Sequence, residues 1–412
     1  MKLGVIDYQL PRGGVERFIL NVLNSLPEDI DVTIYTADNA LDGYQSLLTQ
    51  ATRYIQLVNR PIVKHHVAIV ADGQAALCPQ YVSDLPAELW NGIDIAWLPW
   101  ANRSLLPRQC YMRTVATVHD VIAVELGELM AEKRDAAGRV SAYYCAGMED
   151  MLVRRLMGSL AKVVVDAKRT ADHLGRVYGP LPRTPEVIYL SAEHMGGFTA
   201  EPIDGLRLPP RYVVFPASHH AHKNHETLFL AVAKNKTERP DQFVPLVLTG
   251  WQTEQIGDGS TYRGAYLKAL LDHLHLEIGK DVLLPGKVSD GQYRSILEKA
   301  TGVVFPTLQE GFGFPPIEAA FFGAPLAVSG IEIMRESLAR FDIPAVWFRP
   351  DSVEEIAAAM IRLAAEESEL RALAANRLVD LKSDSWANVG RQYQQAFRDQ
   401  LNVATLFQQY GR

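Results

Sequence analysis

The stretch FPTLQEGFGFPPIEAAFFG, residues 305–323, carries the clearest structural pattern in the chain. It predicts a strand that ends near Phe305, a loop that contains Gly311 and Gly313, and then a helix. The helix begins near Pro315, because the missing N–H of proline costs little in the first helical turn. A glycine loop at a helix N-terminus lets a phosphate approach the backbone amides and the positive end of the helix dipole. This stretch therefore predicts a pyrophosphate-binding site.

Two carboxylates flank this loop. Glu310 immediately precedes the first glycine, and Glu318 lies eight positions later, within the first turns of the predicted helix. We expect both to border one anion pocket, with Glu310 facing the far end of the ligand and Glu318 accepting two ribose hydroxyls. The alternative is that Glu318 only complements the helix dipole and the glycines form a tight turn. The coincidence of two acids, two glycines and two prolines favours the binding site.

Short apolar runs alternate with longer segments of helical period along most of the chain, which predicts an α/β fold with parallel sheets. The expected strands of the first half are 2–6, 31–36, 67–71, 93–98, 114–118, 162–165 and 186–189. Those of the second half are 212–216, 244–249, 282–285, 302–306, 325–328 and 345–348. The expected helices are at about 15–26, 132–160, 223–235, 262–278, 290–299, 315–322 and 352–376.

The proline-rich stretch EPIDGLRLPPR follows residue 200 and has no apolar period, so it predicts a linker. A chain of 412 residues is long enough for two domains that each have a core. We therefore predict two Rossmann-like domains, 1–205 and 206–385, whose parallel sheets face a central cleft. Residues 386–412 form a C-terminal helical segment, which we expect to pack back on the N-terminal domain.

Composition excludes several classes of protein. The apolar content of 48% and the net charge of −7 indicate a folded globular chain with no overall basic field for nucleic acid. The three cysteines, Cys78, Cys110 and Cys145, are widely spaced and suggest neither a disulfide framework nor a zinc site. Asp7 interrupts the N-terminal apolar run, and no uncharged apolar run reaches about 18 residues. We expect a cytoplasmic protein, or one on the periphery of the inner face of the cytoplasmic membrane.

A second motif, FPASHHAHKNHETL at 215–228, also joins a strand to a helix. Lys223 in this turn is placed to set an ammonium beside a diphosphate, with Ser218 and His222 lining the same turn. A lysine at the start of a helix is otherwise an ordinary surface residue.

Two further motifs lie in the first half. The segment TVATVHDV, 114–121, ends a predicted strand with His119. The segment LPRGGVERF, 10–18, again places glycines, Gly13 and Gly14, between a strand and a helix, where the backbone can approach a phosphate. A histidine at a strand end or a pair of glycines is weak evidence when taken alone.

These motifs resemble glycosyltransferase family 4, whose members are retaining enzymes of GT-B fold that use sugar nucleotides. The resemblance is carried by Glu-Gly-Phe-Gly followed by Glu318, by His-Lys-Asn around Lys223, and by His119-Asp120. Segments 284–307 and 348–377 also look like the family, so the resemblance covers nearly the whole chain. Many members carry an arginine upstream of the lysine, where this chain has Ser218, His219 and His220.

The resemblance implies transfer of a hexose from a nucleotide diphosphate sugar to an acceptor hydroxyl, with the acceptor bound by the N-terminal domain and the donor by the C-terminal one. Lys223 stabilises the departing diphosphate, Glu310 grips the donor sugar, and His119 orients the donor, so these are the catalytic candidates. The donor-binding candidates are Glu318, Gly311, Phe312, Gly313, Phe314, Gly13, Gly14, His222 and Ser218.

GDP-mannose is the expected donor, because the His-Lys-Asn context resembles bacterial mannosyltransferases of surface-polysaccharide assembly; UDP-hexoses and a rhamnosyl donor are alternatives. The expected acceptor is a saccharide or a polyprenyl-linked saccharide. The predicted helix at 132–160 carries four arginines beside apolar residues, and such a face suits an anionic bilayer. These arginines are Arg134, Arg139, Arg154 and Arg155. A solvated helix packed on its own domain is the alternative.

No Asp-x-Asp, His-x-Glu or histidine cluster offers a convincing metal site, so we expect metal-independent chemistry without a cofactor. Lys223 and the helix amides would neutralise the leaving diphosphate instead. Two other functions share this two-domain form: a sugar-nucleotide epimerase or hydrolase, and a non-catalytic nucleotide-sugar-binding protein. The first would consume the donor without an acceptor, and the second would bind the donor without turnover.

Overall fold

The structure, a computed structural model, describes residues 1–7, 13–36, 38–48, 53–56, 63–71, 74–82, 92–101, 108–126, 132–134, 140–143, 146–203 and 208–410. The chain divides into two compact units. Unit 1 comprises Met1–Gly127, Ala142–Ser191 and Ser385–Arg412, and unit 2 comprises Glu128–Ser141 and Ala192–Asp384. The sequence-based boundary between residues 205 and 206 lies outside the described residues.

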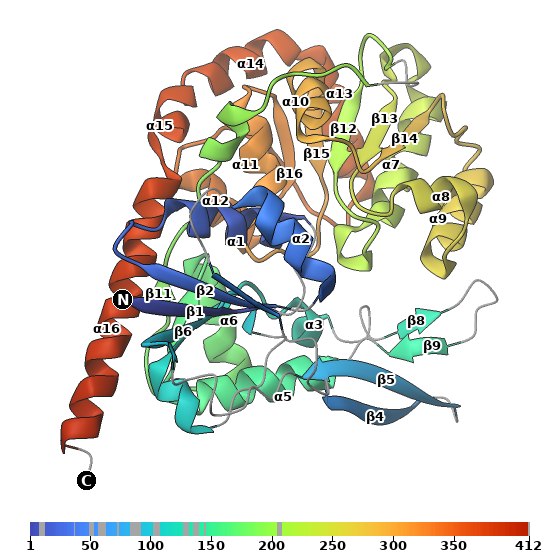
Figure 1. Ribbon diagram of the computed structural model, residues 1–412. Helices are drawn as coiled ribbons and strands as arrows, with labels where there is room; N and C mark the ends of the chain where they lie inside the picture. Colours follow the sequence, from blue (N-terminus) through green and yellow to red (C-terminus); the bar gives the residue numbers. More distant parts are fainter. Residues whose placement is uncertain are drawn as a thin grey trace. The chain divides into compact units, whose positions relative to one another are not determined.

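Unit 1 is built on a parallel sheet of seven strands in the described part of the chain, in the order β11-β10-β7-β6-β1-β2-β3 (Figure 1). The strands are β1 (Lys2–Ile6), β2 (Asp31–Thr36), β3 (Arg53–Gln56), β6 (Ile95–Leu98), β7 (Thr114–Val118), β10 (Lys162–Val165) and β11 (Glu186–Val187). The chain enters the sheet at β1, runs outward to β3, and returns through β6 to the other side of β1. The direction of winding therefore reverses between β1 and β6.

Unit 2 repeats this plan with six described parallel strands in the order β14-β13-β12-β15-β16-β17. The strands are β12 (Val213–Pro216), β13 (Leu246–Thr249), β14 (Val282–Gly286), β15 (Gly302–Phe305), β16 (Leu326–Ser329) and β17 (Val346–Phe348). Numbered along the chain, the order is 3-2-1-4-5-6, that of a dinucleotide-binding Rossmann fold, and the winding reverses between β12 and β15. In open α/β sheets, ligands bind outside the carboxyl ends of the strands at such a switch point.

Helices connect the strands of both units. Those of unit 1 are α1 (Gly14–Ser25), α2 (Asp38–Leu47), α3 (Ile122–Glu125), α5 (Ala146–Met157), α6 (Lys168–Tyr178) and α16 (Trp386–Tyr410). Those of unit 2 are α7 (His225–Glu238), α8 (Glu254–Asp258), α9 (Tyr262–His273), α10 (Asp290–Lys299), α11 (Phe314–Phe321), α12 (Glu332–Ala339), α13 (Val353–Ala365), α14 (Glu367–Ala375) and α15 (Leu378–Ser383). Short 3₁₀ helices occur at Arg108–Arg113, Glu193–Gly197, Ala221–Lys223 and Pro240–Gln242.

The α/β prediction is confirmed, and all six strands expected in the second half are present. The expected helix at 132–160 is wrong in its first part. Residues Glu132–Arg134 (β8) and Val140–Tyr143 (β9) pair as a two-stranded sheet, and the helix begins only at Ala146. Valine and tyrosine favour strands, and this preference prevails over the apolar spacing. Arg134 therefore lies in β8 and not on the helix that carries Arg154 and Arg155. Arg139 lies outside the described residues.

The strand expected at 67–71 is part of β4 (Val63–Ala71), but it does not join the parallel sheet. It pairs antiparallel with β5 (Gln74–Val82) as a separate two-stranded sheet. The two residues between these strands are Asp72 and Gly73, a dipeptide typical of tight hairpins. The sequence-based expectations did not use this dipeptide, and they therefore did not include the hairpin.

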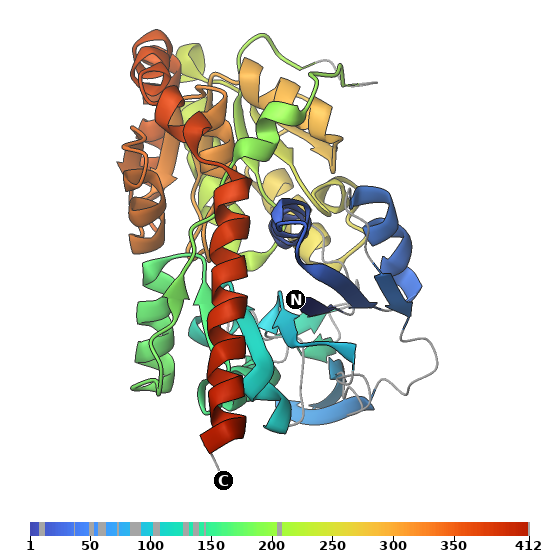
Figure 2. The same ribbon diagram turned by 60° about the vertical axis from the view of Figure 1, so that its left-hand side comes forward.

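The C-terminal helix α16 is part of the core of unit 1, and Figure 2 shows its length. Its buried residues Tyr393 and Phe397 pack against Trp97, with ring centroids 5.3 and 5.9 Å apart. The buried Gln400 side chain donates to the carbonyls of Met112 and Leu160 at 2.7 and 2.8 Å. Met112 lies in the 3₁₀ helix Arg108–Arg113 and Leu160 lies between α5 and β10, so α16 supplies hydrogen bonds that the sheet itself cannot provide.

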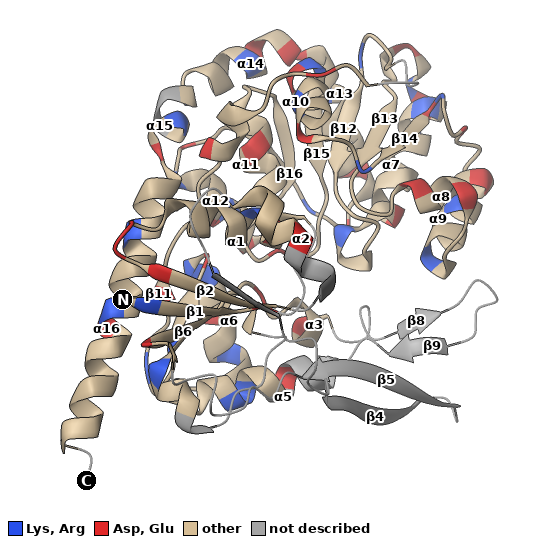
Figure 3. Cartoon of the chain, viewed as in Figure 1, with Lys and Arg blue, Asp and Glu red and all other residues tan. Residues whose placement is uncertain are grey.

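Charged residues of both signs are interspersed along the described parts of both units (Figure 3). No helix in the described ranges is both long and apolar enough to cross a membrane.

The contact between α1 and α16 gives a stability prediction. A Cβ at Gly390 in α16 would lie 2.3 Å from the Ser25 carbonyl oxygen, whereas a Cβ at Gly175 in α6 would meet no atom within 4 Å. We expect Gly390→Ala to lower the free energy of unfolding of unit 1 by about 1–3 kcal/mol through overpacking. Gly175→Ala, the matched control, should raise it by about 0.5–1 kcal/mol. Chemical denaturation with hydrogen exchange of α1 and α16 measures both, and equal stability of the two variants would contradict the packing described.

Candidate functional site

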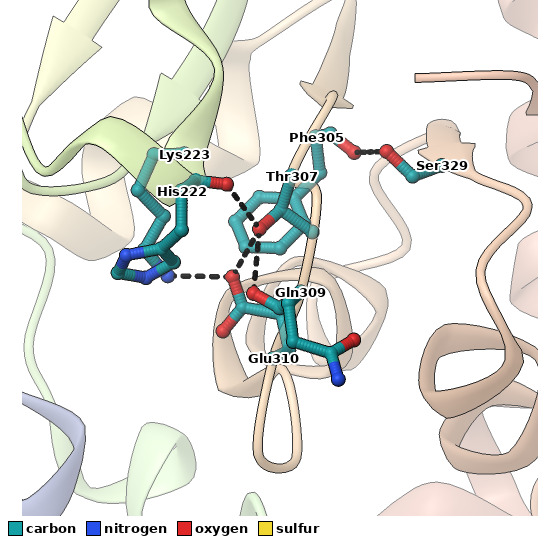
Figure 4. A network of polar contacts seen from close by, with 7 residues as sticks. All are labelled: His222, Lys223, Phe305, Thr307, Gln309, Glu310 and Ser329. Atoms are coloured by element: carbon teal, nitrogen blue, oxygen red, sulfur yellow. Dashed lines mark hydrogen bonds and ion pairs between the residues drawn. The ribbon is translucent and has the colours of Figure 1, made fainter. Parts of the chain in front are cut away.

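The switch point of unit 2 brings together two of the three catalytic candidates. Lys223 follows β12 and Glu310 follows β15, the two strands between which the winding reverses. The Lys223 ammonium donates to Oε1 of Glu310 at 2.6 Å (Figure 4). Their side chains are 13% and 9% exposed. A lysine and a glutamate 87 residues apart in sequence thus form a largely buried ion pair where a Rossmann-like sheet binds its ligands.

Thr307 connects the two loops that carry this pair. Its hydroxyl oxygen lies 2.7 Å from Oε1 of Glu310, 3.0 Å from the Gln309 carbonyl and 3.2 Å from the His222 carbonyl (Figure 4). The Leu308 amide donates to the same His222 carbonyl at 2.8 Å. The loop after β15 is therefore tied to the turn that holds Lys223. Thr307 was not among the predicted site residues, although its place between the strand end and Glu310 was a usable signal.

Asn224, also missed, fixes the backbone beside Lys223. It adopts a left-handed conformation with φ of 64°, which asparagine tolerates better than most residues. Its side-chain amide donates to the carbonyls of Pro306 and Pro350 at 2.9 and 2.6 Å, and Thr227 donates to its oxygen at 2.7 Å. This network joins the turn to the ends of β15 and β17. Asn224 thus sets the direction in which the Lys223 side chain leaves the turn.

Two histidines of this motif, His222 and His225, have a lowered pKa. Burial, followed by the positive charge of Lys223, holds the pKa of His222 well below its usual range. Burial, followed by the charge of Arg263, does the same to the pKa of His225, whose ring packs against Phe215. Neither His222 nor His225 therefore supplies the positive charge of the arginine that many family members carry. Ser218 lies half-buried at the start of the turn.

A second cation does approach this turn, and it comes from a part of the chain that the motifs did not cover. Arg263 of α9 donates to the His219 carbonyl at 3.2 Å and binds Glu226 through two nitrogens. Glu226 offsets the charge of Arg263, whereas the ammonium of Lys223 contacts Glu310 directly.

The predicted glycine loop leads directly into α11. Gly313 is the N-cap residue with φ of 83°, a conformation that favours glycine. The Phe312 carbonyl accepts a hydrogen bond from Ser337 at 2.7 Å, and the Phe312 and Phe314 rings pack with centroids 5.3 Å apart. Pro315 and Pro316 have no N–H, so only two of the first four helix residues, Phe314 and Ile317, carry an amide donor. Loop amides, including that of Gly311, must supply the remaining donors of an anion site.

Glu318 of α11 is only 1% exposed and has hydrogen-bond partners of its own. Tyr293 of α10 donates to its Oε2 at 2.9 Å, and Nε2 of His194 lies 3.3 Å from its Oε1. In this structure the carboxylate therefore links α10 and α11 to the segment that begins unit 2. Its predicted role, binding two ribose hydroxyls, stays a prediction and requires that this buried carboxylate become accessible to the ligand.

In unit 1, His119 is buried at the carboxyl end of β7. Its Nδ1 lies 2.5 Å from Oδ2 of Asp166 and its Nε2 lies 2.8 Å from the Pro99 carbonyl oxygen. Burial lowers the pKa of His119, but the charge and hydrogen bond of Asp166, aided by Pro99 and Asp120, outweigh it, so the net pKa is raised. Two acceptors at the two ring nitrogens fit an imidazolium that donates from both. Orientation of a donor by His119 stays a prediction.

The second glycine pair also stands where a strand leads into a helix. Gly13 is the N-cap of α1 with φ of 90° and is exposed, and Gly14 is the first residue of the helix. The preceding residues 8–12 lie outside the described residues. Among the described residues, no group of three or more histidine, cysteine, aspartate or glutamate side chains is arranged to hold a metal ion.

Comparisons with known proteins agree with the motifs. Residues 200–377 match the family described as glycosyl transferases group 1. The serotype-specific mannosyltransferase WbdA of Escherichia coli is 28% identical over 202 residues, 49% of this chain. The solved structure of HepE of Anabaena in complex with UDP and glucose has a TM-score of 0.67 at 13% identity, covering 97% of this chain and 100% of HepE. Sucrose-phosphate synthase of Thermosynechococcus elongatus has a TM-score of 0.65 at 16% identity, covering 97% and 98% of the two chains.

The chain therefore carries a glycosyl transferases group 1 domain and has the fold of GT-B glycosyltransferases. This confirms the family resemblance and the fold predicted from the sequence. The matched segment spans 23% of the length of WbdA.

The His119–Asp166 pair predicts how the stability of unit 1 depends on pH. The pKa of His119 is higher in the folded protein than in the unfolded chain, so protonation of His119 stabilises the fold. This stabilisation is complete below the unfolded histidine pKa of about 6.5 and is lost as pH rises through the folded pKa. We expect Asp166→Asn to abolish that loss and to lower stability at acid pH. The control, Asp172→Asn, removes an exposed carboxylate paired with Arg169 and should leave the pH dependence unchanged. Urea unfolding between about pH 6 and pH 9 makes the measurement; an unchanged profile for Asp166→Asn would count against the pair.

The burial of Glu318 gives a second prediction. Tyr293→Phe removes a hydrogen bond to a buried carboxylate and should lower the free energy of unfolding of unit 2 by about 1–3 kcal/mol. Tyr266→Phe, at an exposed position of α9, is the control and should have no measurable effect. Thermal and chemical denaturation compare the two variants, and wild-type stability of Tyr293→Phe would show that its hydroxyl does not support Glu318.

Proposed function

We propose that this protein is a retaining glycosyltransferase that moves a hexose from a nucleotide diphosphate sugar to a hydroxyl of a saccharide or lipid-linked saccharide. The observation that carries the proposal is the Lys223–Glu310 pair at the switch point of unit 2, within a glycosyl transferases group 1 domain. A cation for phosphates and a carboxylate for sugar hydroxyls stand side by side there. The sugar-nucleotide reaction needs both at one place.

Lys223 is suited to the departing diphosphate. An ammonium has three N–H donors, and one of them is directed to Glu310, which leaves two for phosphate oxygens. The ammonium also lies 5.3 Å from the centre of the Phe305 ring, whose face favours a cation at this position. Negative charge develops on the diphosphate as the bond to the sugar breaks. A fixed cation that meets this charge lowers the barrier, because the interaction strengthens in the transition state.

Glu310 is suited to the sugar. Lys223 and Thr307 both contact its Oε1, and within the described residues no hydrogen bond involves Oε2. Oε2 can therefore accept a sugar hydroxyl, and the carboxylate charge stabilises the oxocarbenium-like transition state. In the proposed step the bond from the anomeric carbon to the diphosphate breaks, and the acceptor oxygen bonds to that carbon on the same face. The acceptor proton passes to the departing phosphate.

We propose that no divalent metal is needed, because Lys223 and the amides of residues 312–314 provide positive charge for the diphosphate. Transfer should therefore persist in excess EDTA, and complete loss that Mg²⁺ restores would contradict this part of the proposal.

Mannose from GDP-mannose is the proposed donor, supported by the similarity of this chain to a mannosyltransferase. UDP-hexoses are the alternative, since the structurally similar HepE was solved with UDP and glucose. A thermal-shift panel of GDP, UDP, dTDP and their sugars decides between them, because a ligand that binds only the native state raises its melting temperature. The absence of any shift would overturn the proposed function.

Substitutions at the pair test the assigned roles. Lys223→Ala should weaken binding of the nucleotide diphosphate by about tenfold or more, equivalent to about 1.4 kcal/mol. Glu310→Gln should lower kcat by about 10²–10³-fold with a much smaller change in nucleotide affinity. Lys234→Ala, which removes a cation paired with Glu238 on α7, is the control and should behave as wild type. Calorimetry and steady-state transfer assays give these values, and unchanged kinetics for Lys223→Ala would remove this lysine from the site.

A further inference from the structure

We propose that Thr307 is a positioning residue, whose hydroxyl holds Glu310 with Oε1 toward Lys223 and Oε2 available to the sugar. The inference rests on the proposed function, because it assigns a role within that reaction. Thr307 lies within the stretch 305–323, but it was not among the predicted site residues. Its evidence is the hydrogen-bond geometry of the loop after β15 (Figure 4).

Thr307 and Lys223 hold the same carboxylate oxygen. The hydroxyl of Thr307 lies 2.7 Å and the ammonium of Lys223 lies 2.6 Å from Oε1 of Glu310. Two donors on one oxygen, from two different loops, fix the direction of the whole carboxylate. Thr307 is fully buried, so water does not compete for its hydroxyl. A carboxylate held in this way presents its other oxygen in a single direction.

The proton of Thr307 belongs to the bond with Glu310. A hydroxyl has one proton, whereas three acceptor oxygens surround it, those of Glu310, His222 and Gln309. The contact with Glu310 is the shortest, as expected for a charged acceptor. The His222 carbonyl already accepts from the Leu308 amide at 2.8 Å, so it does not require the hydroxyl. The Gln309 carbonyl lies 3.0 Å from the hydroxyl oxygen, farther than Oε1 of Glu310.

The carbon skeleton of Thr307 adds rigidity. Its branched Cβ restricts rotation about χ1, so the hydroxyl has few alternative directions in a fully buried position. Valine has nearly the same shape without the hydroxyl, and serine keeps the hydroxyl without the methyl group. These two substitutions therefore separate the hydrogen bond from the packing.

A matched control exists on the next strand. Ser329 of β16 is also fully buried, and its hydroxyl donates to the Phe305 carbonyl at 3.1 Å (Figure 4). No hydrogen bond joins Ser329 to Glu310 in the described part of the chain. Ser329→Ala thus removes a buried hydroxyl beside the same loop without touching the carboxylate. The kcat of Ser329→Ala therefore shows what a loss of stability alone does to turnover.

The test compares Thr307→Val, Thr307→Ser and Ser329→Ala with wild type, using GDP, GDP-mannose and, where the panel selects UDP, UDP and UDP-glucose. Thr307→Val should lower kcat by about 10- to 100-fold, because a misdirected carboxylate no longer meets the sugar. The affinity of Thr307→Val for the nucleotide diphosphate without sugar should remain within about threefold of wild type. The difference in affinity between the sugar nucleotide and that diphosphate should be lost. Thr307→Ser should recover most of kcat. Ser329→Ala should lower the melting temperature and keep kcat.

Four results would overturn the proposal. The first two are a wild-type kcat in Thr307→Val and no recovery of kcat in Thr307→Ser. The other two are an equal loss of kcat in Ser329→Ala and a loss of affinity for the nucleotide diphosphate without sugar that accounts for the whole effect of Thr307→Val. All four leave the proposed function intact as long as wild type transfers sugar. A wild-type protein that binds none of these nucleotides overturns both. If wild type binds the donor but shows no turnover, the ratio of affinities for GDP-mannose and GDP still decides whether Thr307 directs Glu310.

Discussion

The ion pair between Lys223 and Glu310 is the interaction on which the functional account depends. Removing two charges from water costs free energy, and a buried pair is weak evidence for stability by itself. Here the pair stands at the carboxyl ends of β12 and β15, where sheet order alone predicts a ligand. Its charges match the two ends of a sugar diphosphate, phosphate oxygens for the ammonium and hydroxyls for the carboxylate. The pair is best understood as a binding site formed in advance.

The surrounding structure keeps the pair in place through backbone contacts more than through charge. Asn224 binds the carbonyls of Pro306 and Pro350, and Thr307 and Leu308 contact the His222 carbonyl. These bonds connect the ends of β12, β15 and β17, so the loops that carry the two charges cannot move independently. Preorganised groups of this kind act on a transition state without first having to reorient.

Much of the fold could be predicted from the sequence, because buried parallel strands produce continuous apolar runs that are easily located. The same holds for Glu310 and Lys223, which belong to recognisable motifs next to strand ends. Thr307 and Asn224 lie within the same motifs, but their roles, like that of Tyr293, depend on contacts with distant segments of the chain that a motif does not specify. The two-stranded sheet of β8 and β9 was missed because apolar spacing in a short segment does not distinguish a helix from strands.

Glu318 shows a further limit of motif-based prediction. The spacing from Glu310 is correct for the family motif, but the spacing does not reveal that Tyr293 and His194 contact the carboxylate. A motif specifies residue types and leaves their surroundings open. The tertiary contacts of α10 and of the segment around His194 determine how accessible this acid is.

Hydrogen exchange with and without GDP tests the central claim most directly, because it locates the bound diphosphate without relying on turnover. The account predicts that GDP slows exchange together in residues 218–224 and 307–314, the two loops joined by Lys223, Thr307 and Glu310. Protection confined to other segments, with both loops exchanging as in the free protein, would contradict it.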